Sequence, residues 1–405
     1  MVTEPKGRGE IGRIGVLGAG TMGAGIAQVA AEAGIEVLLH DPLAGAVDGA
    51  RTRIAAFLTR KVEKGQLSAD TAAVALQRLH DTADFEELAG ADLVIEAIPE
   101  DLELKRDAFR RLDAAAPVTT VLATNTSSLS VAQIALATAH PERVLGMHFF
   151  NPVPIMALVE LIPGPLTDPS VTDAALEAVR RLGKTAVLAA DTPGFIVNRV
   201  ARPYYLEALR IVGEGSAAIE QVDAAMRAIG FRMGPFELVD AIGADVNLAV
   251  SQSVFEAFSR APRYAPHPIQ EALVTAGRLG RKAGGGFYDY AADGTRGAPW
   301  TGLGDGPSRP LANGVIADRI LATIVNEAAS AVADGVAAPE AVDLAMRLGT
   351  NYPQGPLAWG EQIGLVSVVR TLDELRAAQP DGRYAVVPLL RSLAEQDGSF
   401  FAPGV

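Results

Sequence analysis

Two polar side chains with the chemistry of an acid–base pair stand in apolar surroundings near the middle of the chain. His148 occurs in Gly146-Met-His-Phe-Phe-Asn-Pro152, and Glu160 interrupts the apolar run Leu158-Val-Glu-Leu-Ile162. A carboxylate in such a run needs a partner or a function, because burying an unpaired charge is unfavourable. Glu160 could orient His148 and stabilise its protonated form, which proton removal from an alcohol requires. The spacing alone leaves this pairing open, and a histidine satisfied within the core is the alternative.

A glycine-rich loop near the N-terminus is the second chemical feature. Gly18-Ala-Gly20-Thr21-Met22-Gly23 follows an apolar run and opens a helical pattern, the context in which G-x-G-x-x-G binds a dinucleotide. Gly18 allows the tight turn, Gly20 admits the pyrophosphate, and Gly23 lets helix and strand pack closely. The N–H groups at the helix start, from Thr21 and Met22 onward, then bind phosphate.

Asp41 favours NAD as the dinucleotide. It ends the second apolar run, about 20 residues after Gly20, where a carboxylate accepts hydrogen bonds from the adenosine ribose hydroxyls. The residues that follow, Pro42-Leu43-Ala44, include no arginine for a 2′-phosphate, which favours NAD over NADP. FAD, or a glycine turn that binds no nucleotide, is the alternative.

The elements that must position these residues alternate between strands and helices. Short apolar runs at 13–17, 35–40, 92–95, 120–123 and 143–146 predict buried strands, with charged amphipathic stretches between them. This alternation predicts a parallel, doubly wound α/β sheet of the Rossmann type. We expect this domain to span residues 1–190.

After Asp191-Thr-Pro-Gly194 the pattern becomes helical, and it repeats. Asn198-Arg199 aligns with Asp318-Arg319 at an offset of 120, and Val222-Asp223 with Val342-Asp343 at the same offset. We therefore expect all-α domains at 191–290 and 315–405, joined by a Gly- and Pro-rich linker at 291–314. The second copy has Asp318 where the first has Asn198 and no counterpart of Arg281-Lys282. We interpret it as a structural duplicate.

Taken in order, the motifs resemble those of the L-3-hydroxyacyl-CoA dehydrogenases. The set comprises the glycine loop, Asn125-Thr-Ser127-Ser128, His148-Phe-Phe-Asn-Pro152, Leu158-Val-Glu160 and Asp191-Thr-Pro-Gly-Phe-Ile-Val-Asn198-Arg199, extended by Gly234-Pro-Phe-Glu237 and Gly286-Phe-Tyr-Asp-Tyr290. The resemblance covers residues 11 to 290. It implies a helical domain like that of 6-phosphogluconate dehydrogenase after the sheet, present here in duplicate, and an NAD-dependent oxidation of an L-3-hydroxyacyl-CoA.

The resemblance also implies a role for individual residues. His148 matches the general base, Glu160 its paired carboxylate, Ser127 the hydroxyl that bonds the substrate oxygen, and Asn198 an amide that holds the substrate. The matching motifs place Asn125, Glu100, Lys105 and Lys282 at the cofactor. Lys64 matches a lysine that meets the CoA portion. The longer architecture is similar to that of short-chain members acting on 3-hydroxybutyryl-CoA or 3-hydroxyadipyl-CoA, as in β-oxidation and phenylacetate catabolism.

Charge and composition limit the partners. A net charge of −13 argues against a nucleic-acid binder, and no apolar run reaches the length of a membrane span. Zero cysteines exclude disulfides and thiolate metal sites, and we expect no metal and a cytoplasmic protein. CoA is polyanionic, and a local basic run, Arg51 to Lys64 with Lys61 in it, could attract it despite the global sign.

Two other functions and two assemblies stay open at this stage. The alternative enzyme is a β-hydroxy-acid dehydrogenase acting on a free or carrier-bound acyl group, and the other alternative is a non-catalytic NAD-binding protein. Because the helical domain of the family pairs two subunits, we expect a homodimer. A monomer is expected instead if the second helical copy occupies that surface within one chain.

Overall fold

An eight-stranded sheet organises the first half of the chain. The computed structural model describes residues 11–303, 307 and 310–402. The strand order of the sheet is β3-β2-β1-β4-β5-β6-β7-β8, and neighbours are parallel except for the antiparallel pair β6–β7. The order reverses between β1 and β4, and α/β sheets bind ligands at the carboxyl ends of strands at such a point. The strands are β1 Arg13–Leu17, β2 Glu36–His40, β3 Leu79–Asp81, β4 Leu93–Glu96, β5 Val121–Thr124, β6 Val144–Phe149, β7 Leu158–Pro163 and β8 Thr185–Leu188.

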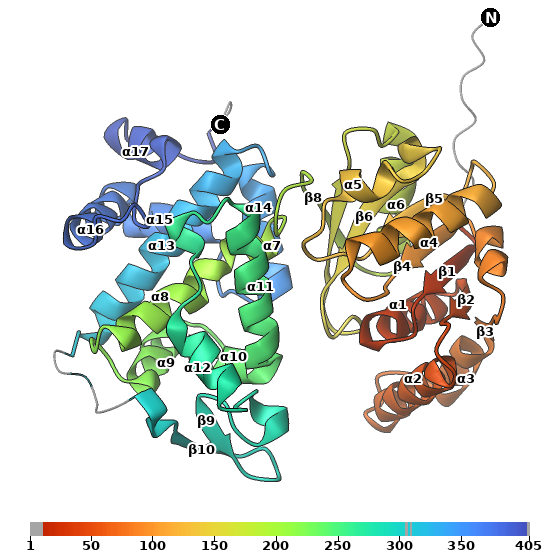
Figure 1. The fold of residues 1–405 in the computed structure, drawn as a ribbon, viewed down its shortest axis with the longest axis horizontal. Helices are drawn as coiled ribbons and strands as arrows, with labels where there is room; N and C mark the ends of the chain where they lie inside the picture. The colour runs from red at the N-terminus through yellow and green to blue at the C-terminus, as the bar shows by residue number, and fades with distance from the viewer. Residues whose placement is uncertain (1–10, 304–306, 308–309, 403–405) are drawn as a thin grey trace, which may run out of the picture. The chain divides into compact units, whose positions relative to one another are not determined.

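Helices cover both faces of this sheet (Figure 1). One apolar core joins the sheet to α1, α2, α3 and α6, and a second joins it to η1, α4 and α5. Because both faces are buried, the central strands are apolar almost throughout. The elements are α1 Thr21–Glu32, α2 Ala46–Glu63, α3 Ala69–Gln77, η1 Phe85–Gly90, α4 Leu102–Ala115, α5 Val131–Ala135, η2 Pro141–Arg143 and α6 Pro169–Arg181.

The five strands predicted from apolar runs are confirmed, each with its bounds within a few residues. The sequence did not predict β3, β7 and β8. The missed β7 is the run that contains Glu160, and its antiparallel pairing with β6 sets Glu160 directly opposite His148. The register of β7 against β6 therefore decides whether the two side chains can meet.

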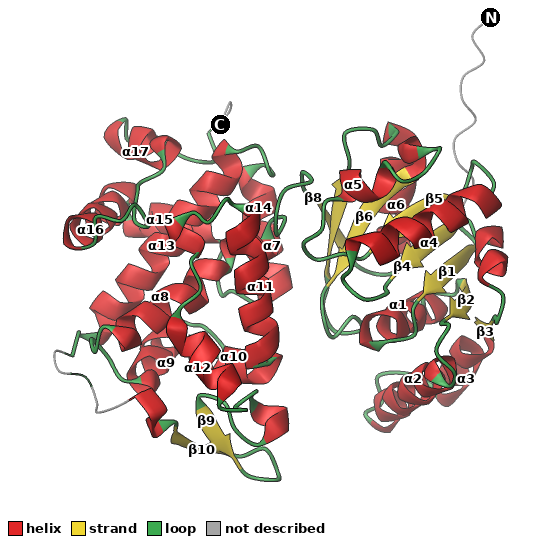
Figure 2. Cartoon of the chain, viewed as in Figure 1, coloured by secondary structure: helices red, strands yellow, loops and turns green. Residues whose placement is uncertain are grey.

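The second half of the chain is helical, as Figure 2 shows. The chain divides into two compact units, Met1–Phe195 and Ile196–Val405, and the second contains both helical copies. The first copy comprises α7 Val197–Val200, α8 Arg202–Gly213, α9 Ile219–Ala228, α10 Pro235–Ile242, α11 Ala244–Ala257, η3 Pro262–Tyr264 and α12 Pro268–Thr275. The second copy comprises α13 Asn313–Ala333, α14 Pro339–Thr350, α15 Pro356–Ile363, α16 Leu365–Ala378 and α17 Pro388–Glu395.

The α-helices of the two copies correspond in order, except that one helix, α13, takes the place of α7 and α8; the short η3 has no counterpart among the described residues. At the joint between α10 and α11, Gly243 has a φ of 119°, and Gly364 repeats this with 95° between α15 and α16. Both values lie where a side chain would be strained, so glycine is required at each joint. Asp223 accepts a hydrogen bond from the N–H of Phe236, and Asp343 accepts one from the N–H of Leu357.

The copies bind each other through reciprocal ion pairs. Arg199 of the first copy donates from Nε to Glu327 of the second over 2.7 Å, and Arg319 of the second donates from Nε to Glu207 of the first over 2.5 Å. Each glutamate also accepts a tyrosine hydroxyl, Tyr264 at Glu327 and Tyr384 at Glu207. These residues are related by the repeat, so the contact has the exchanged pattern of an isologous interface between identical subunits.

The described part of the segment expected as a linker, 291–314, contains secondary structure, and residues 304–306 and 308–309 of that segment lie outside the described residues. β10 Arg296–Pro299 pairs antiparallel with β9 Tyr288–Tyr290, and the short helices η4 Arg281–Ala283 and η5 Thr301–Leu303 flank this hairpin. Its aromatic residues reach the first copy, because the Tyr288 hydroxyl donates to Asp223 over 2.6 Å. The described residues include no helix long and apolar enough to cross a membrane.

Candidate active site

The glycine-rich loop lies between β1 and the start of α1, at the switch point of the sheet. Gly18 has a φ of 104°, and a side chain there would lie 2.6 Å from the carbonyl oxygen of Ala97. A side chain at Gly23 would collide with the carbonyl of Gly18, whereas one at Gly20 would meet no described atom within 4 Å. The first and third glycines therefore allow the turn and the packing, and the second leaves open space for a ligand.

Asp41 follows β2 and faces this loop. Its carboxylate accepts hydrogen bonds from the N–H of Ala19 over 2.8 Å and from the N–H of Leu43 over 2.9 Å, which fixes the side chain at the strand end. Arg53, on α2, donates to the carbonyl oxygen of Ala19 over 2.6 Å. No arginine directly follows Asp41 in the sequence, but the fold brings Arg53 to the loop from a helix.

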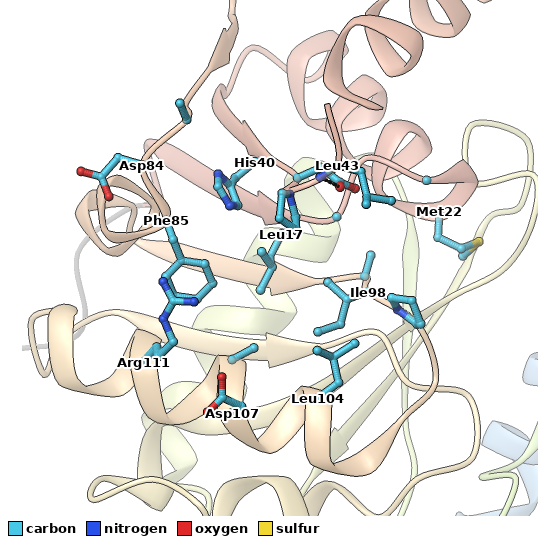
Figure 3. A pocket seen from close by; sticks show the side chains of 18 of the residues that line it. Leu17, Met22, His40, Leu43, Asp84, Phe85, Ile98, Leu104, Asp107 and Arg111 are labelled. Atoms are coloured by element: carbon cyan, nitrogen blue, oxygen red, sulfur yellow. Dashed lines mark hydrogen bonds between the residues drawn. The ribbon is translucent and has the colours of Figure 1, made fainter. Parts of the chain in front are cut away.

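A pocket of about 1240 Å³ opens along the loop (Figure 3). Five of the predicted cofactor residues line it, namely Gly18, Gly20, Thr21, Met22 and Asp41. The opposite wall includes Phe85, Ile98 and Leu104, and the guanidinium of Arg111 lies 3.9 Å from the centre of the Phe85 ring. An apolar slot beside a carboxylate and a helix start fits the adenosine half of NAD. Motif reasoning missed Phe85 and Arg111, since they belong to separate elements with no shared spacing signal.

His148 and Glu160 form a buried pair on neighbouring strands. The distance from His148 Nδ1 to Glu160 Oε2 is 2.7 Å, and the two side chains are 7% and 0% exposed. An ionised carboxylate can only accept, so the proton of this hydrogen bond belongs to Nδ1. Nε2 then carries the lone pair, and this nitrogen can take a proton. The ring of Phe150, 4.4 Å away between centroids, packs against the imidazole.

The loop after β5 brings Ser127 and Asn125 to the same edge of the sheet. The side-chain oxygen of Asn125 accepts the N–H of Phe149 over 2.8 Å, which ties this loop to the residue after His148. Ser127 donates to Glu100 Oε1 from its N–H over 2.8 Å and from its hydroxyl over 3.2 Å. Glu100 therefore holds the serine that the family resemblance places at the substrate.

Glu100 and Lys105 lie together, but only Glu100 reaches the surface. The Lys105 side chain is 1% exposed, and its ammonium donates to Glu96 over 2.6 Å and lies 3.4 Å from Glu100. The family resemblance places Lys105 at the cofactor; in the structure its ammonium contacts two carboxylates, and a contact with the cofactor stays a prediction. Burial raises the pKa of Glu100, but Lys105 and the hydrogen bonds from Thr126 and Ser127 outweigh it and hold that pKa below its ordinary value. Glu100 is thus a carboxylate at neutral pH.

Some cations of the basic run on α2 form ion pairs within the protein, and others are exposed. Lys61 forms an ion pair with Glu32, and Arg51 pairs with Asp81 over 2.9 Å. Lys64, at the end of the helix, and Arg60 are exposed. Much of the charge that the run suggested is therefore compensated within the protein, and Lys64 is better placed than Lys61 to meet an anionic ligand.

The remaining predicted residues belong to the second unit. Asn198 lies in the four-residue helix α7, and Lys282 is exposed in η4. Their contacts with substrate and cofactor stay predictions.

The pocket along the glycine loop and the buried His–Glu pair belong to one sheet, and they are the two parts that an NAD-dependent dehydrogenase combines. The sequence profile of the 3-hydroxyacyl-CoA dehydrogenase NAD binding domain matches residues 13–192, and that of the 3-hydroxyacyl-CoA dehydrogenase C-terminal domain matches residues 194–290 and 314–399. The chain belongs to the 3-hydroxyacyl-CoA dehydrogenase family.

Individual relatives agree with this membership. The chain is 40% identical to a 3-hydroxyadipyl-CoA dehydrogenase of Escherichia coli K12, over 94% of this chain and 97% of that one. It is 42% identical to a 3-hydroxybutyryl-CoA dehydrogenase of Clostridioides difficile, over 69% of this chain and 99% of that one. A crystal structure of 3-hydroxybutyryl-CoA dehydrogenase from Escherichia coli K12 superposes with a TM-score of 0.88, at 39% identity, covering 96% of this chain and 99% of that one. The fold and the enzyme class expected from the sequence are confirmed.

Proposed function

We propose that the protein oxidises an L-3-hydroxyacyl-CoA to the 3-ketoacyl-CoA, reversibly, with His148 as the general base. The observation that carries the proposal is the 2.7 Å contact of His148 Nδ1 with the buried Glu160. With its Nδ1 proton held there, His148 takes the 3-hydroxyl proton on Nε2, and Glu160 stabilises the resulting imidazolium. Ser127 and Asn198 orient the substrate oxygen. NAD, when bound, supplies the hydride acceptor.

The variant His148→Ala tests this role. We expect kcat to fall by about 10²- to 10⁴-fold, the usual contribution of general acid–base catalysis, with the affinity for NADH retained. His80→Ala is a matched control, because His80 also contacts a glutamate, Glu36, over 2.7 Å, but both side chains are about half exposed. This control should turn over like the unaltered enzyme. Robust turnover by His148→Ala would contradict the assignment.

For the substrate, we propose a short acyl chain such as 3-hydroxybutyryl-CoA or 3-hydroxyadipyl-CoA. The support is that the relatives in Escherichia coli and Clostridioides difficile are a 3-hydroxyadipyl-CoA dehydrogenase and a 3-hydroxybutyryl-CoA dehydrogenase. A panel of 3-hydroxyacyl-CoAs from short to long chain, with 3-hydroxyadipyl-CoA included, should give its highest kcat/KM at one of the two named compounds. A maximum at a long chain would contradict the proposal.

In this panel Lys64→Ala should raise KM more than Lys61→Ala, because Glu32 already pairs with Lys61.

For the cofactor, we propose NAD in preference to NADP. The Asp41 carboxylate, fixed by the N–H groups of Ala19 and Leu43, would repel a 2′-phosphate at the ribose position. Arg53 at the Ala19 carbonyl opposes this repulsion in part. The ratio of kcat/KM for NAD over NADP should exceed one in the unaltered enzyme and fall in Asp41→Ala. A ratio below one would contradict the proposal.

For the assembly, we propose a monomer in which the second copy takes the place of a partner subunit. The support is the reciprocal set of ion pairs from Arg199 to Glu327 and from Arg319 to Glu207. The Clostridioides difficile relative, matched over 69% of this chain, has no counterpart for the remainder. Sedimentation of the full chain should give one monomeric species, and a dimer would contradict the proposal. We further propose the cytoplasm as its location, where both NAD and acyl-CoA are present.

A further inference from the structure

Glu96 is a buried carboxylate that the reaction as described does not use. It ends β4, is 0% exposed, and lies opposite Thr124 in the register of β4 and β5. Its Oε2 accepts the Thr124 hydroxyl over 2.7 Å, and its Oε1 accepts the N–H of Ile98 over 2.7 Å and the Lys105 ammonium over 2.6 Å. Burial raises the pKa of Glu96, and the ion pair with Lys105 opposes that rise. A buried carboxylate needs such partners, so this cluster is built around it.

Lys105 connects the buried Glu96 to Glu100 at the surface. Besides Glu96, its ammonium lies 3.3 Å from the carbonyl of Ile98 and 3.4 Å from Glu100 Oε2. A lysine ammonium has three protons, and these three acceptors are available to them. Since the Lys105 side chain is 1% exposed, water does not compete for these contacts. Its place is therefore set by Glu96, the closest carboxylate.

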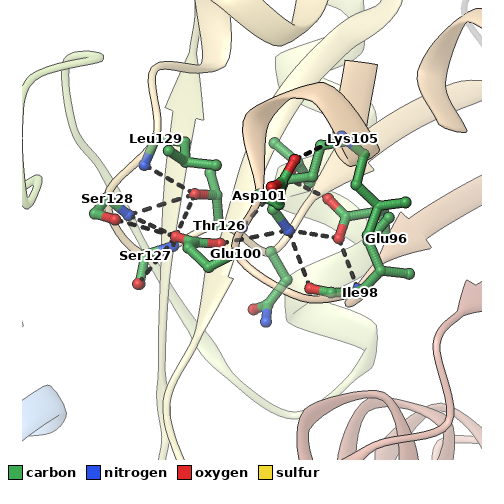
Figure 4. Close-up of polar contacts among 12 residues, drawn as sticks. Glu96, Ile98, Glu100, Asp101, Lys105, Thr126, Ser127, Ser128 and Leu129 are labelled. Carbon is green, nitrogen blue, oxygen red and sulfur yellow. Dashed lines mark hydrogen bonds and ion pairs between the residues drawn. The ribbon is translucent and has the colours of Figure 1, made fainter. Parts of the chain in front are cut away.

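Glu100 carries the chain of contacts to the loop that presents Ser127. Its Oε1 accepts the Thr126 hydroxyl over 2.7 Å, the Ser127 N–H over 2.8 Å and the Ser128 N–H over 3.1 Å (Figure 4). Its other oxygen faces Lys105. The Glu100 side chain is 36% exposed, so without Lys105 it would be able to turn toward solvent and leave the loop. A polar chain thus runs from the buried end of β4 to the Ser127 loop.

We propose that Glu96 is a positioning residue for the reaction, acting through Lys105 and Glu100 on Ser127. The proposal rests on the proposed role of Ser127 as the hydroxyl that bonds the substrate oxygen. Small displacements of a group that orients a substrate reduce the rate strongly, because the reacting atoms leave the productive geometry. The buried cluster limits such displacements in the loop before substrate arrives.

Glu96→Gln tests the proposal in the full-length enzyme, with 3-hydroxybutyryl-CoA and 3-hydroxyadipyl-CoA as probes. The glutamine keeps the size of the side chain and removes the charge that holds Lys105. Its oxygen can still accept the Ile98 N–H, and its amide can donate to the Thr124 oxygen. We expect kcat to fall by about 10- to 100-fold with KM within about threefold of the unaltered value. A kcat that does not fall would overturn the proposal.

A double-mutant cycle with Ser127→Ala separates positioning from a general structural effect. If Glu96 acts through Ser127, Glu96→Gln should lower kcat by less than about threefold once Ser127 is already alanine. Fully additive losses would overturn the proposal. Lys105→Met, which removes the same contact from its other side, carries the same cycle should Glu96→Gln fail to fold.

Asp113→Asn is the matched control. Asp113 forms another buried ion pair of the first unit, with Arg143 over 2.6 Å, and the two side chains are 5% and 1% exposed. This variant should lose stability but keep kcat, and a loss of kcat equal to that of Glu96→Gln would overturn the proposal. Ser127→Ala with unchanged kcat would also overturn it, while leaving the role of His148 intact. An unaltered enzyme without dehydrogenase activity would instead contradict the proposed function.

Discussion

The two helical copies share the residues of the contact between them. Arg199 of the first copy pairs with Glu327 of the second, and Arg319 of the second pairs with Glu207 of the first. The copies also share the glycine between two consecutive helices, Gly243 and Gly364, and a buried aspartate that accepts a backbone N–H at a helix start, Asp223 and Asp343. The side chains that the family resemblance assigns to chemistry are not shared, since Asn198 corresponds to Asp318 and the Lys282 loop occurs once. The comparison indicates that the second copy supports the first rather than repeating its chemistry.

The two ion-pair sets differ in one neighbour. Arg210 lies 3.1 Å from Glu207, and the equivalent position beside Glu327 is Ser330. Glu207 therefore has a second close arginine, whereas Arg263 lies 3.6 Å from Glu327. The two glutamates therefore differ in how close their second arginine lies, although the ion pairs follow the same pattern.

The largest expected effect comes from removing one arginine of this interface. Arg199→Met should lower the free energy of unfolding by about 3–5 kcal/mol, because it leaves a buried glutamate without its main partner. Arg319→Met should lower it less, since Arg210 stays beside Glu207. Urea unfolding of both variants measures the difference. An equal or larger loss in Arg319→Met would show that Arg210 does not compensate.

A smaller effect is expected on turnover when the position that distinguishes the copies is changed. Asn198→Ala should lower kcat/KM by about 10- to 100-fold, the effect of losing a hydrogen bond to the substrate. Asp318→Ala, at the equivalent exposed position of the second copy, should leave kcat/KM unaltered. Steady-state kinetics with one acyl-CoA decides this. Similar losses in both variants would contradict the division of roles between the copies.

The smallest expected effect concerns the pH dependence of stability and the buried Asp223 of the first copy. Burial raises the pKa of Asp223 to about 7, although the Tyr288 hydroxyl bonds its carboxylate. A raised pKa in the folded state means that the bound proton stabilises the fold at low pH and that this stability is lost as pH rises through 7. Between about pH 6 and pH 8 this group alone should lower the free energy of unfolding by about 1.4 kcal/mol.

Asp223→Asn, which imitates the protonated form, should remove this part of the pH dependence. Its Oδ can still accept the Phe236 N–H, and its amide can bond the Tyr288 hydroxyl. Thermal unfolding at the two pH values measures the change. A pH dependence equal to that of the unaltered protein would show that Asp223 does not titrate in this range.

Much of the fold was predictable because its signals are local. Five buried strands were found from their apolar runs, and the duplicated helical pattern was found from residues that recur at a fixed offset. β3, β7 and β8 were missed, since β3 has only three residues, β8 is a partly exposed edge strand, and β7 contains a charged residue that breaks the apolar pattern. β7 matters most, because its register with β6 brings Glu160 to His148.

The sequence by itself determined the glycine loop, the carboxylate at Asp41 and the presence of a His–Glu pair to be tested. These depend on residues close together in the chain, where backbone geometry follows from residue type and spacing. The tertiary structure decided that Lys105 is buried beneath Glu100, that Glu32 compensates Lys61, and that Arg53 reaches the glycine loop. It also decided that each helical copy pairs its arginine with the glutamate of the other. The physical reason is that a charge acts according to its burial and its distance in space, and the spacing of residues along the chain fixes neither.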